Sequence, residues 1–579
     1  MKKLLLGNAA VARGAYEAGV NFVSSYPGTP STEITECMAT YPENEVFVEW
    51  APNEKVAAEA AIGAGIAGGR AMSACKHVGL NVMADPVFTA SYIGVNGGTV
   101  FVVADDPGMH SSQNEQDSRH YARAAKIPML EPSDSEECRD FTALAFEISE
   151  EFDTPVFIRL STRVSHSQSL VELKERKNVP VKEYKKDIAK NVMMPANAVK
   201  KHVVVEERTV KLCEYAKSAA VNTIEDNNSG IGVICAGIDY QYAKEALGEK
   251  VNYLKLGIVW PLSEELIKSF AAKCKKIFVI EELDPFLEDA IKGMGISVTG
   301  KEVFTLLGEY TPAMIKKAVL SEAGAEFISA EAVPVRPPVM CPGCPHRGTF
   351  YVLNKLGLTV SGDIGCYTLG AAAPLKSVDT TICMGASVSA AHGMAKVKGA
   401  EFNKNLVSVI GDSTFMHSGI TALCDIVYNK GANTVIILDN SITGMTGHQD
   451  NPTTGKTIRG EATRQANLIK ICEGLGVEHI TVADPFDVKN FEEVVKAETE
   501  REEVSVIIAQ RPCALLKTVK YTGHCKISDR CKKCRMCMKL GCPAISTDKS
   551  GTVKIDRTQC NGCGLCINVC PFSAIEKEG

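Results

Sequence analysis

Before residue 520, short apolar runs alternate with longer segments in which apolar residues recur at helical spacing. Apolar runs bounded by turn-forming residues predict buried strands, and their alternation with helices predicts parallel sheets. The predicted strands are residues 99–104, 156–160, 231–236, 277–282, 406–410 and 434–439. The pattern therefore predicts an α/β fold over most of the chain.

Two polar, charged stretches interrupt this pattern and predict linkers, at residues 166–195 and 321–338. The apolar pattern changes again near residue 520, where cysteines become frequent. A chain of 579 residues has room for about four domains of ordinary size. The predicted domains are residues 1–165, 196–320, 339–519 and 520–579.

Charge and composition exclude several classes of protein. A net charge of -6 offers no electrostatic footprint for nucleic acid. No apolar run approaches the ~18 residues of a membrane span, and the opening run breaks at Gly7, so we expect no membrane segment and no signal peptide. Cysteines before the tail mostly stand singly in apolar surroundings, as Cys235 does, which favours the reducing cytoplasm.

The tail contains two runs of cysteines in tandem, each ending in Cys-Pro, with the spacing of a ferredoxin that holds two [4Fe-4S] clusters. In such runs the fourth cysteine ligates the other cluster. The predicted ligand sets are Cys531, Cys534, Cys537 and Cys570 for one cluster, and Cys560, Cys563, Cys566 and Cys542 for the other. Zinc is the alternative for CxxC pairs, but zinc needs no third cysteine at the same spacing followed by Cys-Pro. The first run has four residues before its last cysteine where three are usual.

Residues 407–440 contain a strand ending in Gly411-Asp412-Ser413, a helix, and a second strand ending in Asp439-Asn440. The segment resembles the thiamine-diphosphate motif, in which glycine allows close approach to the diphosphate and the following helix N-terminus favours anions. Asp412 and Asn440 supply hard oxygens at the ends of adjacent strands, which suit Mg²⁺. The alternative is an aspartate that merely closes a strand in an α/β fold.

Three further segments carry candidate chemistry. Glu54 lies in the first turn of a helix of small residues, where it is a candidate catalytic acid or base, although the helix dipole alone also favours an acid there. Glu59 of the same helix is the alternative candidate. Thr29 lies in the Pro-Gly-rich segment 26–31, which also reads as a turn capping the next helix. A CxxC pair, Cys341 and Cys344, is followed by two later cysteines, Cys366 and Cys513; taken alone, the pair reads as a helix-capping turn with unligated thiols.

The order and spacing of these motifs resemble the thiamine-diphosphate-dependent 2-oxoacid:ferredoxin oxidoreductases, in the form of the alpha subunit of indolepyruvate:ferredoxin oxidoreductases. The resemblance covers essentially the whole chain. It is carried by YPGTPSTE at 26–33, CPGCPHRG at 341–348, GDIGCYTLGA at 362–371, GDSTFMHSGI at 411–420, LDNSITGMTGHQ at 438–449 and the tail. It implies a pyrimidine-type domain, a transketolase C-terminal-like domain, a diphosphate-type domain and a two-cluster ferredoxin domain, in that order.

The resemblance also implies residue roles. Glu54 would activate the thiamine aminopyrimidine, and Thr29 would contact the substrate carboxylate. The backbone carbonyl of Ile442 would join Asp412 and Asn440 around Mg²⁺, and the four scattered cysteines would hold a proximal cluster. The related pyruvate enzymes also use an arginine for the carboxylate, but residues 102–107 contain none. Three residues could substitute: His110, Arg119 or Arg123.

The implied activity is oxidative decarboxylation of an aryl 2-oxoacid, with indolepyruvate the first choice, to the acyl-CoA and CO2. Electrons would pass through the clusters to ferredoxin. The family places a further domain on a beta subunit, so we expect this partner and a dimer of heterodimers. Two alternatives are a non-oxidative thiamine-dependent decarboxylase and an electron-transfer subunit without catalysis.

Overall fold

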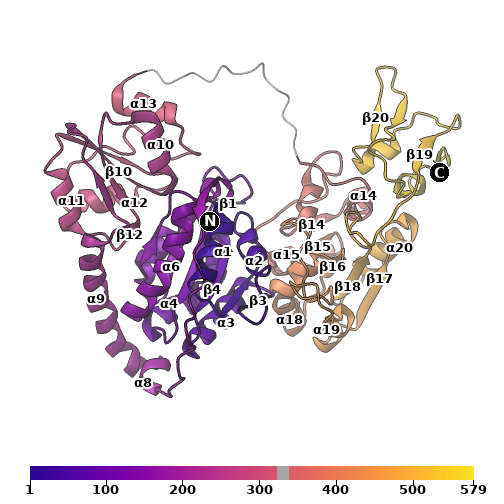
Figure 1. Ribbon diagram of the computed structural model, residues 1–579. Coiled ribbons are helices and arrows are strands. Elements are labelled where there is room, and N and C mark those ends of the chain that lie inside the picture. The colour runs from indigo at the N-terminus through magenta and orange to yellow at the C-terminus, as the bar shows by residue number, and fades with distance from the viewer. Residues whose placement is uncertain (323–337, 579) are drawn as a thin grey trace. The chain divides into compact units, whose positions relative to one another are not determined.

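A computed structural model describes residues 1–322 and 338–578 of the chain (Figure 1). The chain divides into two compact units, Met1–Glu331 and Ala332–Gly579, and each is described by itself. Most of the predicted linker 321–338 lies outside the described residues. No helix in the described ranges is long and apolar enough to cross a membrane.

The first unit is built on a seven-stranded sheet in the order β12-β6-β7-β5-β4-β2-β3. Every neighbouring pair is parallel except β12 with β6. The strands are β2 (Phe22–Ser25), β3 (Phe47–Trp50), β4 (Ala71–Lys76), β5 (Thr99–Asp105), β6 (Met129–Leu130), β7 (Val156–Ser161) and β12 (Ile258–Trp260). Parallel pairing brings the carboxyl ends of β3, β2, β4 and β5 to one edge, which is where ligands bind in open α/β sheets.

Helices pack on this sheet in pairs, α1 against α6 and α3 against α4. Asp134 caps α6 by accepting a hydrogen bond from the Glu137 amide, and Asn53 caps α3 through the Val56 amide. The helices of this half are α1 (Gly7–Glu17), α2 (Thr32–Met38), α3 (Glu54–Ile66), α4 (His77–Ile93), α5 (Arg119–Ala125), α6 (Ser135–Phe152) and α7 (Thr162–His166).

The other half of the first unit has a four-stranded sheet in the order β13-β10-β11-β9. Its strands are β9 (Thr223–Glu225), β10 (Ile231–Ala236), β11 (Asn252–Leu256) and β13 (Lys276–Ile280). Its helices are α9 (Pro195–Ser218), α10 (Gly237–Leu247), α11 (Glu264–Ala271), α12 (Phe286–Gly293) and α13 (Pro312–Leu320). One apolar core contains Phe101 and Phe157 of the first sheet together with Leu254 and Val279 of the second.

Strand β12 follows β11 in the chain but pairs with β6 of the larger sheet. The predicted linker at residues 166–195 contains regular secondary structure. It contains β8 (Gln168–Glu172), antiparallel to β1 (Lys2–Leu6), and the short helix α8 (Ile188–Asn191). The two halves are therefore joined by strand pairing as well as by a shared core.

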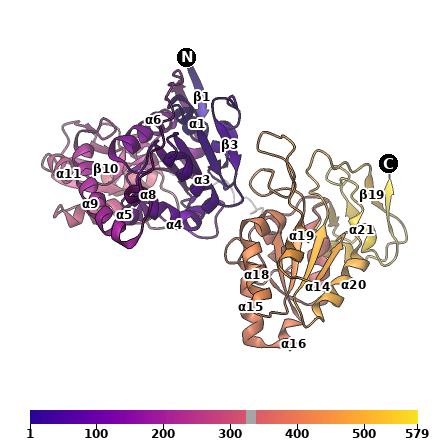
Figure 2. The ribbon, with the colours of Figure 1, turned by 90° about the horizontal axis from the view of Figure 1, so that it is seen from below.

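The second unit contains a five-stranded, wholly parallel sheet in the order β14-β15-β16-β18-β17. Helices α15 and α18 cover one face, and α14 and α20 cover the other (Figure 2). The strands are β14 (Thr359–Ser361), β15 (Leu406–Gly411), β16 (Thr434–Asp439), β17 (His479–Ala483) and β18 (Ser505–Gln510). The helices are α14 (His346–Leu356), α15 (Ala386–Lys398), α16 (Ala400–Asn403), α17 (Asp412–Thr414), α18 (Ile420–Tyr428), α19 (Leu468–Gly474) and α20 (Val488–Thr499).

Side chains alternate between the two faces of this sheet. Ile436 and Leu438 belong to the core under α14 and α20, whereas Val435 and Ile437 belong to the core under α15 and α18. The tail packs into the first of these cores through Leu540 and other residues. It contains two antiparallel strand pairs, β19 (His524–Ile527) with β22 (Ile575–Glu578) and β20 (Ile545–Thr547) with β21 (Val553–Ile555), and the short helix α21 (Leu565–Asn568).

The predicted α/β fold with parallel sheets and a small C-terminal domain is confirmed. Each predicted strand coincides with an observed one, as the run at 406–410 does with β15. The run at 277–282 is shorter in the structure, because β13 ends at Ile280. The next two residues, Glu281 and Glu282, turn into buried polar contacts instead of continuing the ladder.

A buried ion network ties the two sheets of the first unit together. The guanidinium of Arg119 bonds to Asp117 at 2.5 Å and to Glu281, which follows β13, at 2.6 Å. Arg159 of β7 bonds to Asp105 at 2.7 Å and to Glu131 at 2.6 Å. Burial raises the pKa of the Glu281 carboxyl, and the charge of Arg119 opposes that rise. The network therefore depends on its arginines.

Replacing Arg119 with Met should destabilise the first unit by about 3–5 kcal/mol, because two buried carboxylates lose their counter-ion. Arg163→Met is the matched control: it breaks an ion pair with Glu309 in which the arginine side chain is 55% exposed. That change should cost less than about 1 kcal/mol. Urea unfolding monitored by circular dichroism measures both, and equal midpoints for the two variants would contradict the prediction.

Candidate active site and cluster cavities

The carboxyl ends of β15 and β16 place the predicted metal and diphosphate residues together. The two strands are adjacent and parallel, with Gly411 opposite Leu438, so Asp412 and Asn440 follow neighbouring strand ends. Both side chains are buried, as are Ser413 and Ile442. The Ser413 hydroxyl accepts a hydrogen bond from Thr443 at 2.9 Å. All five predicted residues of this site lie at one edge of the sheet.

The Asp412 carboxylate is buried and accepts hydrogen bonds from the Thr453 side chain, the Ser413 amide and the Asn451 side chain. Thr453 donates to it at 2.8 Å. Burial, and then the charge of Asp439, raises the pKa of the Asp412 carboxyl to about 7. Asp439 itself accepts hydrogen bonds from the Ser441 amide and the Gln510 side chain. A buried carboxylate beside an amide oxygen and a second carboxylate is a donor set that fits Mg²⁺.

Tyr367 and His346 close the other side of this edge. A Cβ on Gly411 would lie 2.7 Å from the Tyr367 ring, so this position requires glycine for packing as well as for approach to a ligand. His346 Nε2 lies 3.4 Å from the Asn440 amide nitrogen. Burial lowers the pKa of His346 to about 4, which keeps the ring neutral at physiological pH. Sequence reasoning left His346 without a role, and the structure places it beside Asn440.

The four scattered cysteines gather next to the same edge. The Cys513 amide donates to the Asn440 carbonyl at 2.9 Å, and Cys366 Sγ and the Asn440 side chain both lie within 4 Å of a Cβ built on Gly444. Burial, with smaller contributions from the thiolates of Cys366 and Cys513, raises the pKa of Cys344 to about 12. Burial raises the pKa of Cys366 to about 11, and the charges of Cys513 and Cys341 add to this rise. Thiols brought together in this way fit a soft metal cluster.

The tail contains two cavities lined by thiols. The first is lined by Cys531, Cys534, Cys537 and Cys570, and the second by Cys542, Cys560, Cys563 and Cys566, each with apolar neighbours. Each cavity thus combines three cysteines of one run with the last cysteine of the other. The linings fit cubane clusters, whose thiolate ligands come from loops that turn around the metal.

A fifth thiol, Cys525 of β19, also lines the second cavity and was missed by the spacing argument. Its amide donates to Cys560 Sγ at 3.3 Å. A side-chain hydrogen bond with Cys566 lowers the pKa of Cys525. Cys525 lies outside both cysteine runs. Only the alternation of polar and apolar residues in the short strand β19 could have indicated that its side chain points inward.

In the first unit, Glu54 begins α3 and is 5% exposed. Its carboxylate packs on Gly79 in the first turn of α4, where a Cβ would lie 2.6 Å from Glu54 Oε1. The alternative, Glu59, is exposed and pairs with Lys55 on the helix surface. Of the two glutamates, Glu54 is therefore the buried acid, and it lies at the edge formed by the carboxyl ends of β3, β2, β4 and β5.

Thr29 is half-buried in the loop that follows β2. Ser31 donates to the Gly28 carbonyl at 2.8 Å, and Asn8 donates to the Pro30 carbonyl at 2.6 Å, so the loop is held from both sides. Lys76, at the end of β4, packs its aliphatic stem within 3.3 Å of a Cβ built on Gly28. Burial lowers the pKa of Lys76, and the charges of Asp106 and Glu54 oppose this.

Lys76 was missed by sequence reasoning, because no strand was predicted at residues 71–76, where the structure has β4. Its ammonium donates to the Ser111 carbonyl at 2.8 Å. The three substitutes considered for the carboxylate-binding arginine are engaged elsewhere. Arg119 is fully buried in its ion network, His110 pairs with Glu309 at 2.9 Å, and Arg123 lies over the Trp260 ring.

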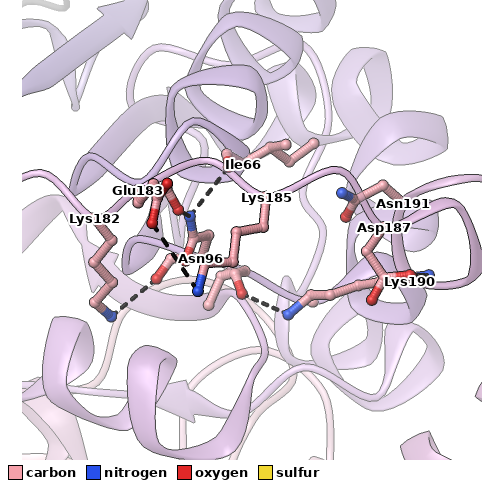
Figure 3. A pocket seen from close by; sticks show the side chains of 10 residues that line it. Ile66, Asn96, Lys182, Glu183, Lys185, Asp187, Lys190 and Asn191 are labelled. Carbon is pink, nitrogen blue, oxygen red and sulfur yellow. Dashed lines mark hydrogen bonds and ion pairs between the residues drawn. The ribbon is translucent and has the colours of Figure 1, made fainter.

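A cavity of about 370 Å³ in the first unit lies away from these residues (Figure 3). It is lined by Ile66 at the far end of α3 and by Lys182, Lys185 and Lys190. Lys182 and Lys190 donate to the carbonyls of Asn96 and Val95. Glu54 is at the opposite end of the 13-residue helix, roughly 20 Å away. This cavity is separate from the edge that carries Glu54 and Thr29.

Comparison with known families matches three stretches of the chain. Residues 13–230 match "Pyruvate flavodoxin/ferredoxin oxidoreductase, thiamine diP-bdg", and residues 363–509 match "Thiamine pyrophosphate enzyme, C-terminal TPP binding domain". Residues 553–576 match "4Fe-4S binding domain". The second match includes Asp412 and Asn440, and the third includes Cys560, Cys563 and Cys566.

Curated relatives align over nearly the whole chain. "Indolepyruvate oxidoreductase subunit IorA" of Archaeoglobus fulgidus is 41% identical, with 99% of this chain and 97% of that protein covered. Proteins of the same name from Thermococcus kodakarensis and Methanothermobacter thermautotrophicus are 39% and 38% identical, with 100% of this chain covered in each case and 97% and 98% of the relatives. By this similarity, the chain belongs to the family of the indolepyruvate oxidoreductase subunit IorA, among the 2-oxoacid:ferredoxin oxidoreductases.

Proposed function

We propose that this chain is the thiamine-binding, electron-transferring subunit of an enzyme that oxidatively decarboxylates an aryl 2-oxoacid, indolepyruvate first, to its acyl-CoA and CO2. The observation that carries the proposal is the contact between two kinds of site in the second unit. The buried Asp412–Asn440 edge adjoins the thiols of Cys366 and Cys513. An organic cofactor bound at the Asp412–Asn440 edge would have an electron-accepting cluster beside it.

In this proposal Asp412, Asn440 and the Ile442 carbonyl hold Mg²⁺, and Gly411 and Ser413 receive the diphosphate. The thiamine ring, when bound, supplies a carbanion that can add to the keto carbon of the substrate. Glu54 holds a proton at the aminopyrimidine nitrogen. Thr29 receives the substrate carboxylate, and Lys76 supplies positive charge beside the same loop. His346 stays neutral and orients Asn440.

The proposed ligands of the proximal [4Fe-4S] cluster are Cys341, Cys344, Cys366 and Cys513. The two tail clusters take the sets that line the two tail cavities, with Cys570 and Cys542 exchanged between the runs. Together the three clusters form a chain of one-electron carriers that ends at a soluble ferredoxin. Support comes from the gathering of each set of thiols in one cavity or beside one strand edge.

The domain boundaries, the partner and the location complete the proposal. Pyrimidine-type, transketolase C-terminal-like, diphosphate-type and ferredoxin domains occupy residues 1–165, 196–320, 339–519 and 520–579. A beta subunit joins this chain in a dimer of heterodimers in the cytoplasm and completes the use of coenzyme A. The relatives are named as subunits, which supports a partner chain.

The decisive experiment is anaerobic analysis of iron, sulfide and thiamine in the chain co-purified with its partner, followed by ferredoxin reduction with indolepyruvate and CoA. About twelve irons, one thiamine and substrate-dependent reduction are expected for three [4Fe-4S] clusters. About eight irons with full activity would remove the proximal cluster. Aldehyde release without ferredoxin reduction would replace the proposal with a non-oxidative decarboxylase.

The affinity for Mg²⁺ and thiamine diphosphate should fall as the pH drops through about 7. The Asp412 carboxyl has its pKa raised to about 7, and the protonated form cannot ligate a metal. Below that pH the affinity should fall about tenfold per pH unit, as one proton is released on binding. Calorimetric titration of cofactor-free protein between about pH 5.5 and 8.5 measures it.

Thr453→Val serves as the matched variant for this titration. The Thr453 hydroxyl donates to Asp412 and lowers the pKa of its carboxyl, so its loss should move the affinity midpoint to higher pH. An affinity that does not change over the whole pH range in the unmodified protein would show that Asp412 is not a ligand.

Glu54→Gln should lower kcat about 10²–10⁴-fold while the protein still binds thiamine diphosphate, because a proton-holding acid is lost without loss of volume. Glu59→Gln, on the exposed face of the same helix, should leave kcat unchanged. Steady-state ferredoxin reduction and thiamine content measure both. Full turnover in Glu54→Gln would move the acid role to another residue.

A further inference from the structure

The loop between Cys341 and Cys344 forms a wall shared by two sets of thiols. Its middle residues, Pro342 and Gly343, line the second tail cavity. Asn561, next to Cys560, donates to the Pro342 carbonyl at 3.0 Å. A Cβ on Gly343 would lie 2.5 Å from the Asn561 side chain, and its φ of 75° also favours glycine. The proximal set and the second tail set are therefore separated by a single tight loop.

Arg347, in the first turn of α14, crosses this wall. Its Nε donates to the Cys341 carbonyl at 3.1 Å, and its Nη2 donates to the Met340 carbonyl. Its Nη1 donates at 2.9 Å to the carbonyl of Leu540, two residues before Cys542. Arg347 also lines the second tail cavity. One side chain thus ties the backbone of one cysteine loop to that of the other.

The charge of Arg347 has no acidic partner in the described part of the chain. Its side chain is 2% exposed, and the hydrogen bonds described all go to main-chain carbonyls. A buried cation without a counter-ion is costly, so such a group indicates an anion nearby. The neighbouring groups that can carry negative charge are thiolates, those of Cys542, Cys344 and Cys341 first. Thiolate-ligated clusters would bring that negative charge.

We propose that Arg347 is the counter-ion shared by the proximal cluster and the tail cluster held by Cys542, Cys560, Cys563 and Cys566, and that it raises the reduction potential of both. The inference rests on the cluster assignments of the proposed function. Each reduction adds one electron, released by oxidation of the 2-oxoacid, and makes or breaks no bond in the cluster. A fixed positive charge stabilises the more negative, reduced form.

The other tail cluster provides an internal reference. Its cavity is lined by Cys531, Cys534, Cys537 and Cys570, and Arg347 is absent from that lining. Removing the charge should therefore lower two of three potentials and leave the third. The same wall would also make the Cys542-containing cluster the one that exchanges electrons with the proximal cluster.

The test is an anaerobic potentiometric titration, followed by electron paramagnetic resonance, of the complete complex carrying Arg347→Gln. Glutamine keeps hydrogen-bond donors but loses the charge. Two of the three cluster signals should shift to lower potential, with at least a tenfold fall in their reduced-to-oxidised ratio at a fixed potential, or about 59 mV. Arg347→Lys, which keeps the charge, should stay near the unmodified complex.

Arg557→Gln is the matched control, because it makes the same charge change in the tail at a side chain that is 67% exposed. It should shift no signal. Unshifted potentials in an iron-replete Arg347→Gln complex would overturn the proposal, as would equal shifts in all three clusters.

If Arg347→Gln loses iron, Arg347→Lys decides. Retained clusters at unchanged potentials support the proposal, and lowered potentials overturn it. Loss of iron from both variants would assign Arg347 a purely structural role. The iron content of the unmodified complex is measured separately, so failure of the three-cluster assignment is distinguished from failure of the role of Arg347.

Discussion

The structure of the second unit depends on one constraint: thiols and a carboxylate must be buried at the edge of the same parallel sheet. The apolar core under α14 and α20 includes Phe350 and Leu438 of the α/β body together with Leu540 and Leu565 of the tail. This continuous packing buries Cys344, Cys537 and Cys566, whereas Cys534 stays exposed. Burial likewise raises the pKa of Asp412, which lies at the carboxyl edge of the same sheet. Exclusion of water thus prepares both kinds of site at once.

Much of this arrangement could be read from the sequence, because it rests on local spacing. The cysteine runs specify loops that turn around a metal, and the cavities follow the predicted exchange of Cys542 and Cys570. The strand ends at Gly411 and Asp439 follow from apolar runs closed by polar residues. Each of these signals lies within one short stretch of the chain, residues 411–440 or 531–570, and the fold does not need to be known to interpret it.

The residues that were missed act over long separations. Arg347 contacts Leu540, which is 193 residues away, and no local pattern links the two. Lys76 is recognised only when β4 is placed beside β2, and Cys525 only when β19 is placed against the second cavity. Arg119 was considered as a ligand for a carboxylate from its position alone. Its true partners, Asp117 and Glu281, became evident only when the second sheet was packed against the first.

The position of β12 has a consequence for how the first unit can evolve and fold. This strand belongs by sequence to one half and by pairing to the sheet of the other. Separating the halves at the stretch before α9 would strip β6 of its edge partner and leave a row of unpaired backbone groups. The stretch before α9 therefore separates the two halves in the sequence but does not separate them in the structure. An exchange of the middle segment between relatives would have to carry β12 and a compatible β6 together, as a single inherited piece.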